Sequence, residues 1–412
     1  MKKIGILFDG FDWWGGGISF VEFILSGIVS YAETQGDYKI YVIKKNNISR
    51  KLLSYIYLCK NIFSKNILNS VSLFKSTKNP LGSEATRRLK NISQKILFIQ
   101  YFQTLASLNS LLHKHDIDCV TLTLKPLGKL RTKWIGYVPD CQHKYFPYFF
   151  SESEIKARDK LILQMLNCAS DVICNGREVR ADLLKFYGQE INSVPNIHSL
   201  PFTPYLSRTQ IEAAYNPSHN LKKYGLKKNQ YFIICNQFWA HKDHATAFVA
   251  FNNFYKNLDN AESDWHLVCT GAQNDYRDPS HFEKLTKLLE ELKIKSQVIL
   301  TGHIDRLDQL CLLAMSAGVI QPTLFEGGPG GGAVYDGVSL GKVCFTTSIP
   351  INLEVEAEQI EYFPPGDSDE LSKLLNHQAL LMEDKDICVE KLVEKSKKNQ
   401  LNLGKFIYSI IK

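Results

Sequence analysis

Short apolar runs rich in β-branched residues alternate along this chain with longer stretches of helical periodicity. This alternation is typical of βαβ units, in which parallel strands buried on both faces are joined by helices. The runs in the first half are KIGILFD (3–9), YKIYVIK (38–44), DCVTLT (118–123), WIGYV (134–138) and DVICN (171–175). Those in the second half are YFIICNQ (231–237), WHLVCTG (265–271), QVILTG (297–302), AGVIQPT (317–323) and KVCFTT (342–347). The pattern predicts an α/β protein with two doubly wound parallel sheets.

A proline-bearing segment without periodicity separates the two halves. The stretch VPNIHSLPFTPYLSRTQIEAAYNPSHN carries four prolines, which interrupt regular structure. A chain of 412 residues also exceeds the length that one hydrophobic core ordinarily serves. We predict a Rossmann-like first domain over residues 1–205 and a Rossmann-like second domain over 206–390. Residues 391–412 are predicted to form a helix that packs back on the first domain.

Composition excludes several classes of protein. The chain is 44% hydrophobic and 22% charged, which is typical of a globular protein. No run approaches the roughly 18 apolar residues that a spanning helix needs, and Asp9 interrupts the N-terminal apolar run before a signal-peptide core is complete. The ten cysteines are scattered, with neither a CxxC pair nor metal-ligand spacing. These features predict a cytoplasmic protein with free, mostly buried thiols.

Positive charge is concentrated in residues 44–95. This segment holds twelve Lys and Arg residues against one acid, Glu84, in a chain of net charge +7, and aromatic residues are interleaved with the basic ones. One hypothesis is a surface that docks on anionic lipid headgroups, each basic residue contributing about 1 kcal/mol. The protein would then lie on the inner face of the cytoplasmic membrane. A solvated basic face without a partner is the alternative, and no nucleic-acid-binding signature is present.

Two glycine clusters follow predicted strands and precede predicted helices. Gly15, Gly16 and Gly17 lie between the first strand and a helix expected from Ile18. The stretch FEGGPGGGAVYDG (325–337) follows the strand at 317–323 and precedes a helix expected from about Gly332. Bare backbone N–H groups at a helix N-terminus favour phosphate. The spacing does not fit the dinucleotide fingerprint, so NAD is disfavoured. A structural turn is the alternative in both places.

Polar residues beside the second cluster complete a candidate site. Glu326 and Asp336 could accept hydrogen bonds from sugar hydroxyls, and a phosphate flanked by such acceptors describes a nucleotide sugar. Lys242 follows the strand at 231–237, at the edge of an open α/β sheet where ligands bind. It could neutralise a diphosphate there, although an ordinary surface lysine is the alternative.

These stretches resemble the donor domain of GT-B glycosyltransferases of family 4, a retaining group that includes O-antigen and capsule mannosyltransferases. The family motif has two glutamates separated by seven residues; here nine residues separate Glu326 from Asp336. In NQFWAHK, Lys242 matches the family lysine, and Gln237 stands where the family usually has arginine. The loop at 15–17 resembles the acceptor-domain loop that meets the donor phosphates. GYVPDCQHKYFPYFFS resembles the region that supplies an active-site histidine, which makes His143 the candidate.

The resemblance implies two domains that face a cleft, and it implies a role for each residue. Lys242 and the backbone N–H groups of Gly16, Gly330 and Gly331 would stabilise the leaving diphosphate, which is commonly the largest catalytic contribution. Glu326 would orient the donor sugar, and Asp336 would bind the ribose. His143 would contact the sugar or acceptor, with a packed histidine as the alternative. The remaining predicted donor-site residues are Gly15, Gly17, Gln237 and Gly332.

The resemblance also implies a reaction. A sugar would pass from a nucleoside diphosphate to a hydroxyl of a lipid-linked or polysaccharide acceptor in bacterial O-antigen, capsule or lipopolysaccharide synthesis, with retention of configuration. The leaving phosphate would take the acceptor proton, and no metal or other cofactor is expected. Two alternatives remain: a GT-B isomerase of the nucleotide-sugar 2-epimerase kind, and a non-catalytic nucleotide-sugar binder.

Overall fold

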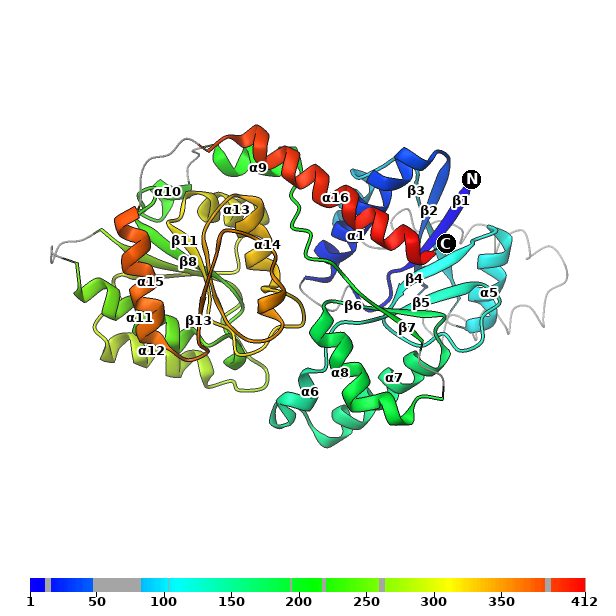
Figure 1. Cartoon of the computed structure of the whole chain (residues 1–412), viewed down its shortest axis with the longest axis horizontal. Helices are drawn as coiled ribbons and strands as arrows, with labels where there is room; N and C mark the ends of the chain where they lie inside the picture. The colour runs from blue at the N-terminus through cyan, green and yellow to red at the C-terminus, as the bar shows by residue number, and fades with distance from the viewer. Residues whose placement is uncertain are drawn as a thin grey trace, which may run out of the picture.

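Two parallel sheets, one in each half of the chain, form the two lobes seen in Figure 1. The structure is a computed structural model, and it describes residues 1–11, 16–46, 83–102, 104–192, 195–216, 220–258, 264–381 and 387–411. The prediction of two doubly wound α/β units is confirmed by this architecture.

The first sheet has seven strands in the order β3-β2-β1-β4-β5-β6-β7, all parallel. They are β1 (Lys2–Leu7), β2 (Tyr38–Lys45), β3 (Ile96–Tyr101), β4 (Cys119–Thr123), β5 (Lys133–Val138), β6 (Asp171–Cys174) and β7 (Asn196–Ser199). The helices of this lobe are α1 (Gly17–Gln35), α4 (Ser83–Lys90), α5 (Leu105–Lys114), α6 (Gln142–Tyr145), α7 (Glu152–Cys168) and α8 (Arg177–Tyr187). The strand order turns back between β1 and β4, so the loop after β1 lies at a topological switch point.

The second sheet has six parallel strands in the order β10-β9-β8-β11-β12-β13. They are β8 (Tyr231–Cys235), β9 (His266–Thr270), β10 (Val298–Gly302), β11 (Gly318–Gln321), β12 (Cys344–Thr347) and β13 (Ile360–Phe363). Its helices are α9 (Arg208–Tyr215), α10 (Asn220–Lys223), α11 (His244–Lys256), α12 (His281–Glu291), α13 (Arg306–Met315), α14 (Gly331–Ser339) and α15 (Ser368–Leu381). Here the switch point lies between β8 and β11.

Alternate side chains of the central strands pack against helices on opposite faces of each sheet. In β8, Tyr231 and Ile233 enter one core, whereas Phe232 and Ile234 enter the other. The first sheet is likewise sandwiched between two cores. Burial on both faces explains why these strands are continuous apolar runs in the sequence. The nine described cysteines all have free thiols, and five of them are buried.

Three strands were not predicted, and all three lie at sheet edges. β3 and β7 border the first sheet, and β13 borders the second. β7 and β13 have only four residues, and neither is wholly buried. In β3 only the two end residues are buried; Leu97 is exposed and the other three residues are partly buried. An edge strand contacts fewer neighbours, so it needs neither the length nor the apolar run that the prediction relied on.

The helix α16 (Val389–Ile411) joins the two lobes, as Figure 1 shows in red. It packs against α1: Gln400 Nε2 donates to the carbonyl of Ser26 at 3.2 Å, and a Cβ atom on Gly404 would lie 1.9 Å from the carbonyl oxygen of Gly27. We propose the domain boundary at residue 205, because it lies between β7 and α9, outside any helix or strand. Within the described residues, no helix combines the length and apolarity needed to cross a membrane.

Candidate functional site

The strands β8 and β11 lie side by side at the centre of the second sheet, and their carboxyl ends carry the candidate donor site. The loop after β8 forms a 3-10 turn, η4 (Ala240–Lys242), and leads into α11. The loop after β11 contains Glu326 and the glycine-rich stretch, and it leads into α14. In open α/β sheets, ligands bind in the crevice outside the strand ends at such a switch point.

Lys242 and Glu326 form an ion pair across this point. The Lys242 ammonium donates to Glu326 Oε1, and the two side chains are 10% and 9% exposed. Glu326 Oε1 also accepts from Gln321 Nε2 at 2.7 Å. A Cβ atom on Gly331 would lie 3.0 Å from Glu326 Oε2, so the second carboxylate oxygen faces the N-terminus of α14. Sequence reasoning gave these two residues separate roles and did not predict their contact.

The glycine-rich loop brings the two domains together. A Cβ atom on Gly327 would lie 3.2 Å from Asp140 Oδ2, and one on Gly328 would lie 3.1 Å from Asn175 Cβ. Asp140 and Asn175 follow strands β5 and β6 of the first domain. Larger side chains at positions 327 and 328 would therefore crowd the first domain, and this contact explains two of the glycines without any ligand.

Two further glycines of the loop are required by the backbone. Gly330 and Gly331 have φ angles of +67° and +65°, which side-chain-bearing residues rarely adopt. Their N–H groups are already used: Gly330 N donates to Asn352 Oδ1 at 3.0 Å and Gly331 N to the carbonyl of Gly328 at 3.3 Å. The expectation that these N–H groups bind phosphate therefore needs correction, because each has a partner within the protein.

Gly332 faces open space and is not required by packing. A Cβ atom there would meet nothing within 4 Å, and within the described residues its N–H group has no hydrogen-bond partner. As the second residue of α14, Gly332 presents its N–H outward from the helix N-terminus, where an anion is favoured. Of the three predicted phosphate-binding glycines at 330–332, Gly332 alone keeps the property on which the prediction rests.

Asp336 is held by an arginine that sequence reasoning missed. The two terminal guanidinium nitrogens of Arg306 donate to the Asp336 carboxylate: Nη1 to Oδ2, and Nη2 to Oδ1 at 2.6 Å. The Asp336 side chain is 8% exposed, and the Arg306 side chain is 37% exposed. Arg306 begins α13, the helix that follows β10, which places it at the carboxyl ends of the strands, as the donor site is. The sequence signal that could have identified Arg306 is a basic residue at the first position of a helix that follows a strand.

Gln237 lies in the loop after β8 and is partly buried. Its carbonyl accepts from Trp239 N at 2.8 Å, and within the described residues its side chain forms no hydrogen bond. A cation that was not predicted lies close by: the Arg277 guanidinium stacks 4.9 Å from the Trp239 ring and 5.0 Å from the Phe149 ring. Asp275, its salt-bridge partner, also accepts from Ala240 N at 3.2 Å and so fixes the turn that carries Lys242.

Gly16 and Gly17, predicted in the first domain, lie at the other switch point. Gly15 falls outside the described residues. Gly16 caps α1, and a Cβ atom on Gly17 would lie 1.9 Å from the carbonyl oxygen of Phe11. Packing therefore requires a glycine at position 17. The backbone N–H group of Gly16 remains a candidate for contact with the donor phosphates at the N-terminus of α1.

His143 is packed inside the first domain. Its side chain is fully buried in α6, and Nε2 lies 2.9 Å from Asp159 Oδ1 and 3.0 Å from the Tyr187 hydroxyl. Nδ1 is buried and has no partner within the part of the chain that the structure describes, and burial lowers the pKa of the imidazole. This position matches the packed histidine that the sequence left as an alternative, rather than a group that reaches a donor sugar.

The basic segment is described only in part, because residues 47–82 lie outside the described residues. Arg88 is not free, since it pairs with Glu22 and donates to Ser19 Oγ at 3.0 Å. Lys95 lies 4.5 Å from the Tyr38 ring. Arg87 and Lys90 of α4 are exposed and remain candidates for contact with a charged surface.

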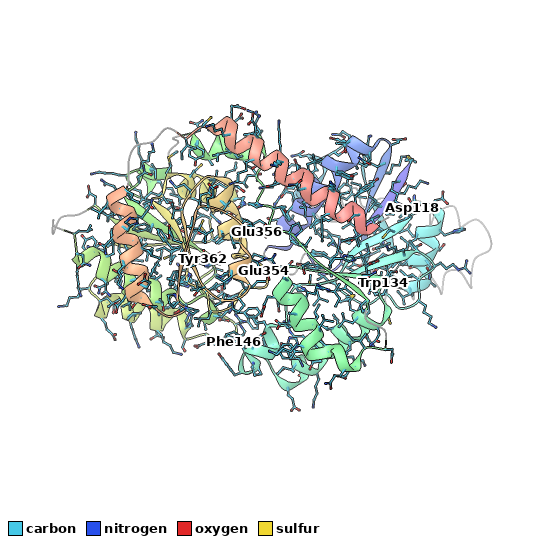
Figure 2. All side chains as sticks on the ribbon, viewed as in Figure 1. Asp118, Trp134, Phe146, Glu354, Glu356 and Tyr362 are labelled. Carbon is cyan, nitrogen blue, oxygen red and sulfur yellow. The ribbon has the colours of Figure 1, made fainter. Side chains whose placement is uncertain are left out.

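A short 3-10 turn of the second domain reaches the first. In η5 (Asn352–Glu354), the Glu354 carboxylate accepts from Arg177 N at 2.7 Å and from Glu178 N at 2.6 Å, the first two residues of α8. Figure 2 shows Glu354 between the two lobes. A carboxylate at a helix N-terminus satisfies orphan N–H groups and interacts favourably with the helix dipole. The second domain thus supplies the cap of a first-domain helix.

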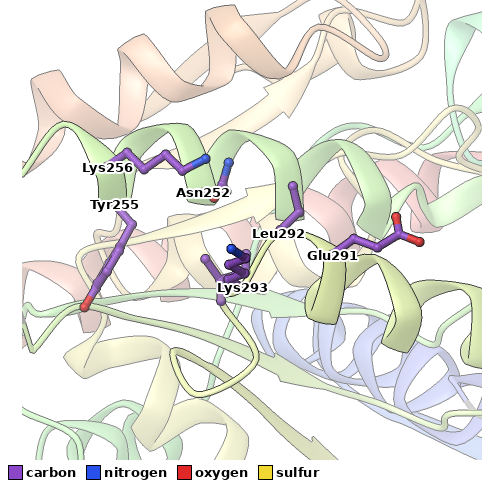
Figure 3. A pocket seen from close by; sticks show the side chains of 7 residues that line it. Asn252, Tyr255, Lys256, Glu291, Leu292 and Lys293 are labelled. Carbon is purple, nitrogen blue, oxygen red and sulfur yellow. The ribbon is translucent and has the colours of Figure 1, made fainter.

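A cavity of about 420 Å³ lies elsewhere on the second domain. Figure 3 shows its lining, which includes Asn252 and Lys256 at the end of α11 and Glu291 at the end of α12. Lys242 precedes the opposite end of α11, so this cavity is separate from the candidate donor site.

Comparison with solved structures places the architecture. A glycosyltransferase from Rickettsia africae ESF-5 is similar over 100% of this chain and 98% of that chain, with a TM-score of 0.61 at 14% identity. Anabaena HepE in complex with UDP is similar over 99% of this chain and 95% of that chain, with a TM-score of 0.58 at 12% identity. WaaG, a glycosyltransferase involved in lipopolysaccharide biosynthesis, is similar over 98% of this chain and 95% of that chain, with a TM-score of 0.54 at 14% identity. No curated protein sequence matches this chain.

Two doubly wound domains, with a candidate donor site at the switch point of the second, define the GT-B fold, and the predicted fold class is confirmed. Residues 218–399 match the family of glycosyl transferases group 1. Residues 218–399 therefore form a group 1 glycosyltransferase domain, the catalytic domain type of a retaining GT-B group of enzymes, and the whole chain has the GT-B fold.

Proposed function

We propose that this enzyme transfers a sugar from a nucleoside diphosphate to a hydroxyl of a lipid-linked or polysaccharide acceptor in bacterial surface-glycan synthesis. One observation carries the donor half of the proposal: Lys242 and Glu326 pair at the carboxyl ends of β8 and β11, beside the N-terminus of α14. A cation and a hydrogen-bond acceptor at one switch point suit a diphosphate and an adjoining sugar.

Each group then has a defined task in the reaction. The Lys242 ammonium and the N–H group of Gly332 would stabilise the charge that develops on the diphosphate as its bond to the anomeric carbon breaks. Glu326 Oε2 would accept from a donor-sugar hydroxyl. The acceptor oxygen forms the new bond on the same face, and its proton passes to the leaving phosphate. The products are a nucleoside diphosphate and a glycoside of retained configuration.

Asp336 is proposed to reach the ribose together with Arg306. The Asp336 carboxylate is occupied by the guanidinium fork, so a ribose hydroxyl would share this ion pair or replace one of its contacts. Gln237, in place of the family's usual arginine, would leave Lys242 as the main cation of the β8 loop. Asp140 and Asn175, which lie next to Gly327 and Gly328, would face the acceptor side of the cleft.

The acceptor half is supported by the kinds of enzyme that share the fold. WaaG acts in lipopolysaccharide biosynthesis, and HepE was captured with UDP and, in a second structure, with UDP and glucose. The exposed Arg87 and Lys90, with the rest of the basic segment 44–95, would hold the enzyme at the anionic inner surface of the cytoplasmic membrane, where a lipid-linked acceptor is reached.

The donor site is tested by thermal unfolding with UDP, GDP, dTDP, CMP and NAD. A ligand at about 100 times its dissociation constant adds about 2.7 kcal/mol to the free energy of unfolding. We expect a raised melting temperature with one nucleoside diphosphate in the wild type and no such shift in Lys242→Ala. Removing Lys242 leaves Glu326 without its cation and lowers the melting temperature itself, so the measured quantity is the shift that ligand causes.

Lys256→Ala is the matched control, because Lys256 lines the separate cavity of the same domain. Loss of the shift in this variant alone would move the anion site to that cavity. No shift with any diphosphate would remove the proposal. With the donor base known, the labelled nucleotide sugar and a polyprenyl-diphosphate oligosaccharide test transfer, and the same assay in EDTA tests the prediction that no metal is needed.

A further inference from the structure

Gln321 is a fully buried amide in an otherwise apolar strand. It ends β11, is 0% exposed, and pairs in register with Thr346 of β12. Burying an amide is costly unless its groups are hydrogen-bonded. A purely structural strand position at the centre of the sheet would more simply hold an apolar side chain, as Val319 and Ile320 do.

Both ends of the Gln321 amide have partners. Its Oε1 accepts from Asn236 Nδ2 at 2.7 Å, and its Nε2 donates to Glu326 Oε1 at 2.7 Å. Asn236 directly follows β8 and is 8% exposed, so the contact bridges the two strands of the switch point. The residues form a buried polar chain from Asn236 through Gln321 and Glu326 to Lys242.

The contacts with Glu326 and Asn236 fix which way the Gln321 amide points. With the amide reversed, the Gln321 oxygen would face the Glu326 carboxylate and its NH₂ group would face the NH₂ group of Asn236. Both contacts would be repulsive, because a carboxylate only accepts and an amide nitrogen only donates. The Glu326 carboxylate therefore selects the orientation in which Gln321 donates to it, and Asn236 satisfies the other end of the amide by donating to Gln321 Oε1.

Gln321 is a second hydrogen-bond donor to Glu326, and a bound ligand does not compete for it. Lys242 and Gln321 both donate to Oε1, whereas Oε2 faces the N-terminus of α14. A diphosphate would draw on the Lys242 ammonium, but it cannot reach the fully buried Gln321. A hydrogen bond to a charged acceptor is also stronger than one between neutral groups.

We propose that Gln321, supported by Asn236, is the positioning residue of the donor site: it holds the Glu326 carboxylate in place while Lys242 turns to the donor diphosphate. This inference rests on the proposed role of Glu326 in the donor site. Gln321 does not touch the donor; it acts through Glu326.

The first test is a crystal structure of Gln321→Met beside that of the wild type. Methionine keeps the length and approximate volume of glutamine but cannot donate to Glu326. We expect the Glu326 side chain to leave its position or to occupy several positions. Thr346→Val is the matched control, because Thr346 is the register partner on β12 and its buried hydroxyl has no partner among the described residues. Glu326 should be unchanged in this variant.

The second test separates donor-sugar orientation from diphosphate binding. In Gln321→Met we expect kcat with the nucleotide sugar to fall roughly ten- to a hundredfold, the range for losing a hydrogen bond to a charged group. The dissociation constant of the free nucleoside diphosphate, measured by calorimetry, should stay within about twofold, since Lys242 is intact. A merely structural role would weaken both together.

Asn236→Ala completes a double-mutant cycle. If Asn236 acts through Gln321, its substitution lowers kcat in the wild type but has little further effect in Gln321→Met. If the losses in kcat of the two single variants add in the double variant, Asn236 does not act through Gln321. An unchanged Glu326 in the Gln321→Met crystal would overturn the proposal whether or not the enzyme binds a diphosphate. A moved Glu326 in a protein that binds no diphosphate would instead overturn the proposed function and leave the positioning contact established.

Discussion

His244 begins α11 two residues after Lys242, with both ring nitrogens buried and without a partner among the described residues. Its ring stacks on Phe238 at a centroid distance of 4.1 Å and an interplanar angle of 12°. Burial lowers the pKa of the imidazole to about 3. The side chain is therefore neutral across the physiological range and is used as an aromatic ring, at the cost of unsatisfied polar atoms.

We expect His244→Phe to raise the free energy of unfolding, and to raise it more at acid pH. The pKa is about 3 in the folded protein and about 6.5 when unfolded, so the unfolded state binds the extra proton between these values. Stability is consequently lost as pH falls below about 6.5, by about 1.4 kcal/mol per pH unit for this one group. Urea unfolding at pH 7.5 and 5.5 measures the difference. Equal gains at both pH values would mean that packing, and not the proton, is responsible.

The candidate site was predictable where a residue type and its place after a strand were enough. Lys242 and Glu326 were found in this way. Their contact was not, because 84 positions separate them and only the adjacency of β8 and β11 brings them together. Gln321 was included in a predicted strand as an ordinary strand residue. His143 was chosen by resemblance, and its burial depends on Asp159 and Tyr187, which are distant in sequence.

The N-terminus of α14 combines glycines required by the fold with one that leaves room. Gly331 needs a positive φ and approaches both Gln321 and Glu326, whereas Gly332 has open space in front of it. Packing against β11 and β12 accounts for Gly337, where a Cβ atom would lie 2.5 Å from Cys344 Sγ. The stretch of six glycines therefore reflects several separate steric requirements and one candidate contact with a ligand.

We expect opposite effects from alanine at positions 331 and 332. Gly331→Ala should lower the free energy of unfolding by about 1 to 3 kcal/mol, because the left-handed backbone is strained for alanine. Gly332→Ala should raise it by up to about 1 kcal/mol, since alanine favours a helix more than glycine does. The Gly332→Ala variant should nevertheless bind a nucleoside diphosphate more weakly. Chemical unfolding and calorimetry on the two variants test this. A Gly332→Ala protein with full affinity would show that no phosphate lies there.

Strand prediction succeeded for the interior of both sheets and failed mainly at their borders. Ten strands were expected from apolar runs, and each is present within a few residues of its expected position. The three that were missed, β3, β7 and β13, border the sheets, where partial exposure removes the signal. β7 also lies within the proline-bearing segment that separates the two halves of the chain, and the prolines conceal its strand signal.

A short turn of the second domain, η5, adds to the contacts that join the two domains at the site. In η5, Asn352 accepts from Gly330 N of the donor loop, and Glu354 accepts from the first two N–H groups of α8 in the other domain. A Cβ atom on Gly176 would lie 2.6 Å from Ile351 Cδ1, so the glycine before α8 allows this approach. The position of the donor loop is thereby tied to the position of the first domain.

We expect Glu354→Ala to loosen this tie. The variant removes both contacts to α8, and loss of a helix cap costs about 0.5 to 2 kcal/mol. The melting temperature should fall, and the radius of gyration from small-angle X-ray scattering should rise as the domains separate. Glu356→Ala is the control, because among the described residues Glu356 forms only an exposed ion pair with Arg177 at 3.6 Å, worth about 0 to 1 kcal/mol. Equal scattering from both variants would mean that other contacts hold the domains.

The packing of α16 on α1 has a consequence for how the protein is made. Leu403, Ile407 and Tyr408 belong to the same core as Ile24 and Ile28 of the first domain, and Gln400 bonds to a residue 374 positions earlier. A ribosome releases the first sheet long before it has made these side chains. The domain that begins folding first is thus completed last, and the apolar face of α1 remains a surface for chaperones to cover until residues 400–411 have emerged.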